Sequence, residues 1–226
     1  MSRGGGRSGT SALTRALLWS GVAAGPLFVT VFTTEGARRP GYRPARHPVS
    51  SLSLGPRGWV QVANFTAAGT LLVAGAAGLS RARADVVGTR LVPGLVGAAG
   101  VGLLISAAFP TDPVGGYPPG TPDALPAPSA AMIGHEIGAI PVFLGLPAAA
   151  LACAWRFGRS GHAGWAVYSA ATAASVAANM GFAGAGFSQS AGMADRGGLF
   201  QRAAIITAFG WITALSARSL RRGTPA

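Results

Sequence analysis

The chain has 226 residues, half of them hydrophobic, and its 18 basic residues are all arginine against six acidic residues, which gives a net charge of +12. The arginines stand in short segments between apolar stretches, a placement that fits membrane orientation and lipid head groups better than nucleic acid, so we expect no nucleic-acid partner. No loop is long enough to hold a core of its own, and the single cysteine, Cys153, excludes an intrachain disulfide. We therefore expect one domain over 1–226.

Six apolar stretches follow one another along the chain, each of about 19–25 residues, the length of a helix that spans a bilayer. Backbone amides in lipid must be paired within the segment, so each stretch is expected to be a helix. The fold class predicted is an all-α integral membrane bundle of six transmembrane helices joined by short loops. The predicted helices are 13–34, 59–79, 91–109, 131–155, 163–187 and 199–217, with disordered tails at 1–9 and 223–226.

The first apolar run is longer than the hydrophobic region of a signal peptide and lacks a good cleavage site, so we expect a retained helix. Arginines are in excess in the segments that share a side with the N-terminus. By the positive-inside rule, this excess favours cytoplasmic placement of both termini in a multi-pass plasma-membrane protein. The first outer loop opposes the trend because it is itself rich in arginine.

Small residues recur within the stretches, as in the pairs Gly21 with Gly25 and Gly134 with Gly138. Such pairs let helix backbones approach closely, either within one chain or across a dimer, and we favour the intramolecular interpretation. The oligomeric state stays open. Pro141 interrupts the fourth stretch and predicts a local kink there.

The loop after the first helix is the most unusual segment of the chain. Glu35 closes the helix, and Arg38, Arg39 and Arg46 follow in a dense cationic patch that also holds His47. Guanidinium groups suit phosphate and carboxylate, so these residues are candidates to bind an anionic head group. The alternative is a loop that simply covers anionic lipid head groups.

Further polar residues lie near the same ends of the later helices. The candidate ligand-binding residues among them are Asn64, Asp112, Asn179, Gln201 and Arg202, and the candidate acid–base residues are His135 and Glu136 together with Glu35. An ionisable group within a spanning helix is a functional-site hypothesis by default. The alternative is that these groups are solvated at the membrane interface.

Metal and serine chemistry are not favoured by the pattern. Adjacent His135 and Glu136 point about 100° apart on a helix, and there is no HExxH motif, so we predict no metal and no cofactor. Ser50, Ser51 and Ser53 follow His47 at a spacing with no recognised catalytic geometry. Acid–base work by a carboxyl group remains the more plausible chemistry, and whether the protein is an enzyme stays open.

The chain resembles a bacterial, actinobacterial-type membrane family catalogued as domain of unknown function 998. The resemblance rests on Arg46-His-Pro-Val-Ser-Ser-Leu-Ser-Leu54, Gly55-Pro-Arg-Gly-Trp-Val-Gln61, Phe109-Pro-Thr-Asp-Pro113, Gly116-Tyr-Pro-Pro-Gly120 and Gly198-Leu-Phe-Gln-Arg202. It covers nearly the whole chain and implies a six-helix membrane protein. It implies no activity.

Together these observations predict a pocket in the outer leaflet that binds or processes an amphipathic, lipid-like or isoprenoid-like ligand. Arg38, Arg39 and Arg46 would hold an anionic head group, and membrane lipids would be the other partners. The alternatives are a non-catalytic membrane partner or assembly factor and, less favoured because the inner half lacks polar groups, a small-molecule transporter.

Overall fold

A computed structural model describes residues 11–82, 90–123 and 127–222 of the chain. Those residues form helices and irregular loops, with one isolated bridge between Val114 and Tyr117, so the all-α prediction is confirmed for them. The two predicted tails, 1–9 and 223–226, lie outside the described residues.

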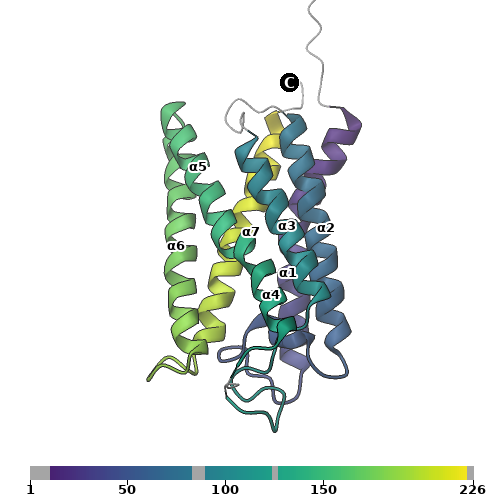
Figure 1. The fold of residues 1–226 in the computed structure, drawn as a ribbon. Coiled ribbons are helices and arrows are strands. Elements are labelled where there is room, and N and C mark those ends of the chain that lie inside the picture. Colours follow the sequence, from purple (N-terminus) through teal and green to yellow (C-terminus); the bar gives the residue numbers. More distant parts are fainter. Residues whose placement is uncertain (1–10, 83–89, 124–126, 223–226) are drawn as a thin grey trace, which may run out of the picture.

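The helices run lengthwise through the molecule (Figure 1). Their bounds are α1 Ala12–Arg38, η1 Val49–Ser53, α2 Gly58–Ala82, α3 Leu91–Ala108, α4 Ala130–Ile140, η2 Pro141–Gly145, α5 Leu146–Arg159, α6 Ala163–Phe187 and α7 Gly197–Arg222. The predicted stretches match these helices closely. The first and fourth stretches, however, each continue four residues beyond their predicted ends and α7 continues five, and the longer first helix places Glu35 and Arg38 inside α1.

Among the described residues, five helical segments are long and apolar enough to cross a membrane: α1, α2, α3, the continuous run Ala130–Arg159 and α7. The protein is therefore a multi-pass membrane protein. The predicted sixth span corresponds to α6, which has 25 residues and is not among these five.

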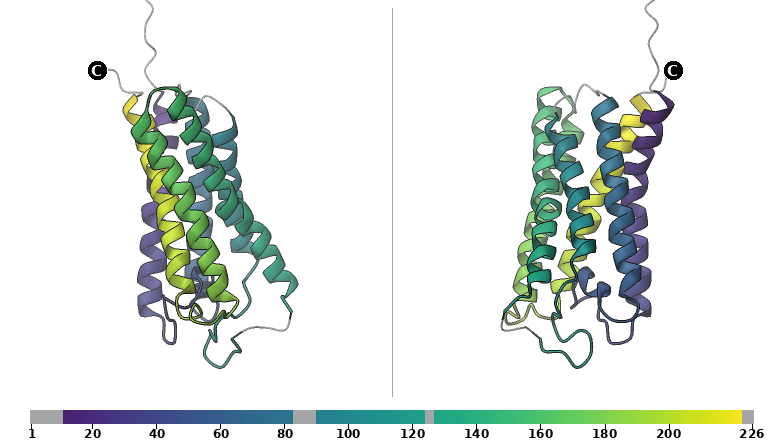
Figure 2. Two further views of the ribbon diagram at one scale, coloured as in Figure 1. Left: turned by 90° about the vertical axis from the view of Figure 1, so that its left-hand side faces the viewer. Right: turned by 45° about the vertical axis from the view of Figure 1, so that its right-hand side comes forward.

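Consecutive helices pack side by side and close into a bundle. Each of α1, α2 and α3 contacts the next, α5 contacts α6, α6 contacts α7, and α7 returns to α1 (Figures 1 and 2). The start of α1 and the end of α7 lie at one end of the bundle, and the loop residues 39–57, 109–123, 127–129 and 188–196 lie at the other.

Glycines set the closest helix contacts. A Cβ on Gly75 of α2 would lie 2.7 Å from the Cα of Gly21 in α1, and a Cβ on Gly138 of α4 would lie 2.6 Å from the carbonyl oxygen of Gly102 in α3. These distances leave no room for a larger residue. At Gly21 and Gly138, small residues therefore serve packing within one chain, as the sequence indicated.

The fourth stretch is bent where Pro141 enters it. Proline has no backbone N–H to donate, and residues Pro141–Gly145 form a π turn (η2) between α4 and α5. After the bend, α5 packs on α6. Before the bend, α4 packs on α3 and makes no close backbone contact with α6 or α7 among the described residues. The bend therefore separates α4 from α6 and α7 at the loop end.

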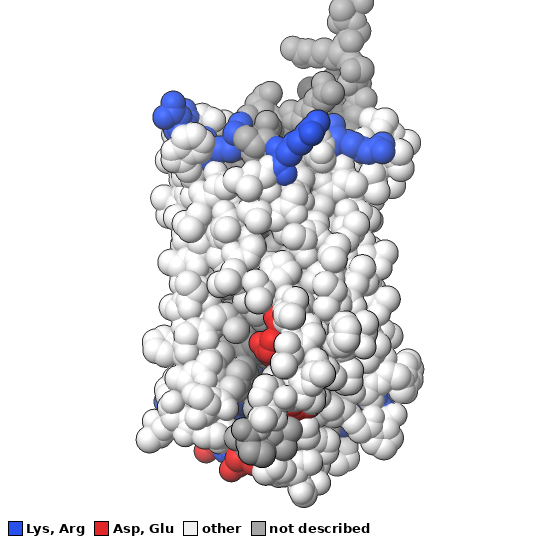
Figure 3. Space-filling model, in the orientation of Figure 1, with Lys and Arg blue, Asp and Glu red and all other residues white. Residues whose placement is uncertain are grey.

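Charge is segregated along the bundle axis (Figure 3). Arginines form a band at the end that holds the start of α1 and the end of α7, both acidic groups and further arginines lie at the loop end, and the flank between is almost uncharged. An acidic side chain is visible on that flank, at the edge of a groove in the molecular surface.

Candidate functional site

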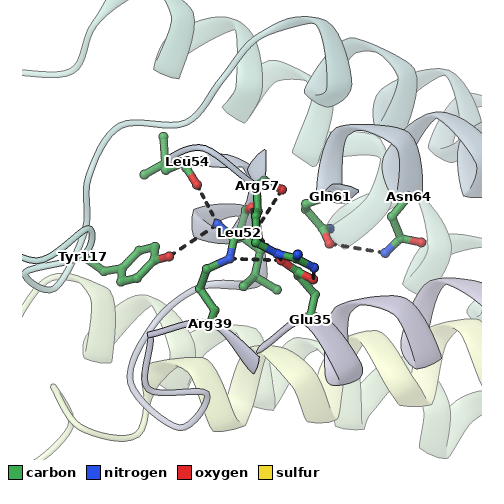
Figure 4. A network of polar contacts seen from close by, with 8 residues as sticks. All are labelled: Glu35, Arg39, Leu52, Leu54, Arg57, Gln61, Asn64 and Tyr117. Atoms are coloured by element: carbon green, nitrogen blue, oxygen red, sulfur yellow. Dashed lines mark hydrogen bonds and ion pairs between the residues drawn. The ribbon is translucent and has the colours of Figure 1, made fainter. Parts of the chain in front are cut away.

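Glu35 is the centre of a buried ion cluster at the loop end of α1 (Figure 4). Arg39 donates to its Oε1 from Nε at 3.1 Å and from Nη2 at 2.7 Å. Arg57 donates to Oε1 from Nε at 2.9 Å and to Oε2 from Nη2 at 2.8 Å. Guanidinium groups keep their protons, so the carboxylate between them is held ionised and engaged by protein donors.

The remaining donors of Arg39 face the chain that follows. Its Nη2 donates to the carbonyl oxygens of Leu52 and Arg57 at 3.1 and 3.0 Å, and its Nη1 donates to that of Leu54 at 2.7 Å. The side chain is 6% exposed. Arg39 therefore anchors η1 to the end of α1 and has no donor directed to solvent.

Gln61 and Asn64 lie next to this cluster on α2 (Figure 4). Asn64 Nδ2 donates to the carbonyl of Phe28 at 3.1 Å and to Gln61 Oε1 at 3.3 Å. Both residues are buried, and Gln61 Nε2 and Asn64 Oδ1 have no partner among the described residues. The pair joins α2 to α1 and lies apart from the cavity described below.

Arg46 holds three loops together. Its Nε donates to the carbonyl of Gly115 at 3.0 Å, Nη2 to Asp123 at 2.7 Å and Nη1 to Asp195 at 2.8 Å. Arg46 and Arg43 lower the pKa of the Asp195 carboxyl, chiefly through the hydrogen bond from Arg46. Asp123 and Asp195 escaped the sequence analysis because each is a single loop acid far from Arg46 along the chain.

His47 completes this loop junction as a neutral imidazole. Its Nδ1 accepts from the backbone N–H of Arg43 at 2.9 Å, so Nε2 carries the proton and donates to the carbonyl of Gly115 at 3.1 Å. Gly115 has φ of 67°, which turns its carbonyl toward both donors. Burial lowers the pKa of His47 below its usual 6.5, and the neighbouring arginines act in the same direction.

Arg202 and Gln201 fasten the same loop to the start of α7. Arg202 donates to the carbonyls of Pro44 and His47 and to the hydroxyl of Tyr42. Gln201 Oε1 accepts from the N–H of Val49 at 2.8 Å. Both side chains therefore position the loop, and only Gln201 also reaches the cavity.

A cavity of about 210 Å³ lies between α4, α6 and α7, on the side where the bend at Pro141 separates them, and residues of α1, α2, α3, η1 and η2 complete its walls. Its walls are mainly apolar and come from Phe28, Val49, Phe65, Leu103, Ala139, Val142, Phe143, Met180, Gly184, Phe187 and Ile205, with polar groups from Ser50, Ser106, His135, Glu136 and Gln201. Glu136 is exposed, so the cavity reaches the surface beside it.

His135 is buried in the cavity wall with one ring nitrogen fixed. Its Nδ1 lies 3.1 Å from the carbonyl oxygen of Ser106 and 2.9 Å from that of Phe109, and because both are acceptors Nδ1 carries the proton. Nε2 is then an acceptor, and it has no hydrogen-bond partner among the described residues. The end of α3 thus sets the tautomer of a histidine that lines the cavity.

Glu136 lies on α4 about 9 Å along the axis from the helix start, at 1.5 Å per residue. It shares a helix face with Ala139 and Phe143, both of which line the cavity, while Ile137 and Ile140 on the adjoining face are exposed. Glu136 has no ion-pair or hydrogen-bond partner within the described ranges. A carboxylate without a partner beside a lipid-facing surface is costly, which points to a function.

The other predicted site residues lie elsewhere. Asp112 accepts from the N–H and hydroxyl of Ser129, at 2.7 Å each, and so fixes the start of α4. Asn179 donates to the carbonyl of Ser175 within α6. Arg38 is exposed, with no partner among the described residues. Most of the candidates therefore belong to a loop junction, an α1 ion cluster or the cavity pair His135 and Glu136, whereas Arg38 and Asn179 lie outside all three.

Sequence reasoning missed most of the cavity wall. Met180, Gly184 and Phe187 read as ordinary residues of an apolar helix, and nothing in their spacing distinguishes them from their neighbours. Within the described residues, no group of three or more His, Cys, Asp or Glu could hold a metal ion.

Comparison with known families gives a match over most of the chain. A family model described as a protein of unknown function (DUF998) matches residues 22–218. No curated protein and no solved structure matches the chain.

Proposed function

The chain belongs to the DUF998 family, whose function is unknown, and from the site we propose that it binds an amphipathic, lipid-like or isoprenoid-like ligand in the cavity between α4, α6 and α7. The supporting observation is that a mainly apolar cavity reaches the surface at a carboxylate that has no partner among the described residues. An apolar chain would occupy the cavity, and the head group would lie against His135 and Glu136. Apolar pockets with a few convergent polar groups are typical ligand sites.

The proposal places the cavity in the outer half of the membrane. We propose that α6 is the sixth span, because it lies alongside α5 and α7 and equals α2 in length. The arginine band around the start of α1 and the end of α7 favours a cytoplasmic position for that end, which fits the plasma membrane (Figure 3). Lateral entry between α4 and α6 would then bring the ligand directly from the lipid.

The expected arginine clamp is not part of this proposal. Arg39 and Arg46 donate to groups of the protein itself. Should the ligand also be processed, His135 and Glu136 are the groups placed for proton transfer, since Glu35 is enclosed by two guanidinium groups.

Two glycines of α6 supply a matched test of cavity binding. Gly184 lines the cavity and Gly181 does not, and at both positions an added Cβ has open space around it. Native mass spectrometry of protein released from its own membrane should show a defined adduct in the wild type. The adduct should be lost in Gly184→Phe and retained in Gly181→Phe. An adduct that survives equally in both variants, or none beyond bulk lipid, would contradict the proposal and favour a non-catalytic membrane partner.

A further inference from the structure

The polar groups of the cavity indicate the class of its ligand. Resting on the proposed function, we infer that the ligand's head group donates hydrogen bonds and carries no negative charge, as in an alcohol or a protonated amine. This differs from the anionic head group that the arginine-rich loop had indicated.

His135 supplies the first reason. Two backbone carbonyls hold the proton on Nδ1, at 3.1 and 2.9 Å, so the unpartnered Nε2 offers a lone pair and no proton. The residue is 4% exposed and lines the cavity. An acceptor nitrogen on a cavity-lining residue is satisfied by a donor and not by a second acceptor, so a ligand that donates to Nε2 is favoured over one that only accepts.

Glu136 supplies the second reason. An ionised carboxylate is acceptor-only, and this one is exposed at the cavity mouth without a cation beside it among the described residues. No arginine of the described chain lines the cavity. A phosphate or carboxylate head group would therefore face a like charge with nothing to offset it, whereas an ammonium or hydroxyl would bind favourably.

The arginines that would offset an anion are held elsewhere. Arg46 is bound by Asp123 and Asp195, and Arg39 by Glu35. Arg202 donates to backbone carbonyls and to the Tyr42 hydroxyl. None of these side chains lines the cavity, so recruiting one would break contacts that hold the loops in place.

Gln201 and Ser50 complete the pattern for a hydroxyl group. Gln201 uses Oε1 to hold the N–H of Val49, which leaves its Nε2 donors without a partner in the described residues. Both side chains line the cavity. A ligand hydroxyl that donates to His135 or Glu136 could therefore accept from Gln201 or Ser50 with the same oxygen.

The test uses three amphiphiles that share one alkyl chain. The full-length protein is placed in phosphatidylcholine nanodiscs with a photoreactive decanol analogue, and decanol, decylamine and decyl phosphate compete for labelling at equal mole fractions in the membrane. We expect decanol and decylamine to compete at least about tenfold better than decyl phosphate, since a like charge is absent from both. Glu136→Gln should remove most of that difference, while Asp195→Asn, a carboxyl change in the loop after α6 that does not line this cavity, should preserve it.

The outcomes separate the two proposals. Cavity labelling that decyl phosphate suppresses as well as decanol does would overturn the head-group inference and leave the proposed function standing. An unchanged preference in a folded Glu136→Gln variant would also overturn it. Labelling that is no stronger in the wild type than in Gly184→Phe would overturn the proposed function itself, and this inference with it.

Discussion

Arg39 Nη2 lies 2.7 Å from Glu35 Oε1, one helical turn away at the end of α1, and both side chains are about 95% buried, at 6% and 5% exposure. Arg57 reaches the same carboxylate from outside, with 57% of its side chain exposed. Each arginine pairs with Glu35, but only Arg39 depends on it to satisfy a buried charge.

This difference predicts unequal costs of truncation. Arg39→Ala should lower the free energy of unfolding by about 3–5 kcal/mol, because it leaves the Glu35 carboxylate partly unpaired and frees the carbonyls of η1. Arg57→Ala should cost much less, since its charge is solvated. Thermal unfolding in a mild detergent compares the two, and equal losses would contradict the assigned roles.

Gly198 at the start of α7 lies against the loop backbone. A Cβ at this position would collide with the carbonyl oxygens of His47 and Pro44. Gly198→Ala should therefore destabilise the protein by about 1–3 kcal/mol and loosen the loop junction.

Gly210, on the same helix, is the control for that substitution. It has open space around its Cβ position, so Gly210→Ala should be neutral or slightly stabilising. Limited proteolysis of the loop 39–57 measures this loosening, and the loop should be cleaved faster in Gly198→Ala than in Gly210→Ala. Equal resistance of the two variants would count against the proposed packing.

His47 predicts a pH dependence of stability. Burial lowers its pKa in the folded state, so below about pH 6.5 the unfolded chain binds more protons at this residue than the folded one. The melting temperature should therefore be steady above that pH, fall as the pH drops through the window between the two pKa values, and level off below it.

The His47→Gln variant isolates this contribution. Other titrating groups are common to both proteins, so the difference between the two pH profiles reports on His47. The profile of His47→Gln should be flatter than that of the wild type. Parallel profiles would show that His47 is not held neutral in the folded protein.

The elements of this fold could be predicted because an apolar run of bilayer length has few alternatives to a helix. The partners of the polar residues could not. Glu35 and Arg39 are four residues apart, the spacing of a helical ion pair, but the predicted helix ended at 34 because the apolar character ends there. Had the predicted helix been extended through Arg38, the helical spacing would have assigned Arg39 as the partner of Glu35. The buried Arg39 would then have been distinguished from the exposed Arg38.

The cavity illustrates what lies beyond sequence patterns. Pro141 predicted a kink, but the direction in which α4 leans depends on the close contact of Gly138 with Gly102 and on the hold of Asp112 on Ser129. Those contacts join segments 17 or more residues apart. His135 and Glu136 could be singled out from the sequence, whereas the α6 residues that face them could not.

The most direct measurement maps where a membrane-soluble photoreactive amphiphile labels the protein. An alkyl chain that carries the reactive group near its end should label Met180, Phe187 and Ile205 in the cavity, and a cavity filled by Gly184→Phe should lose that labelling. Labelling confined to outward-facing residues such as Ile133, Leu144 and Val167, and unchanged by Gly184→Phe, would contradict a ligand-binding cavity.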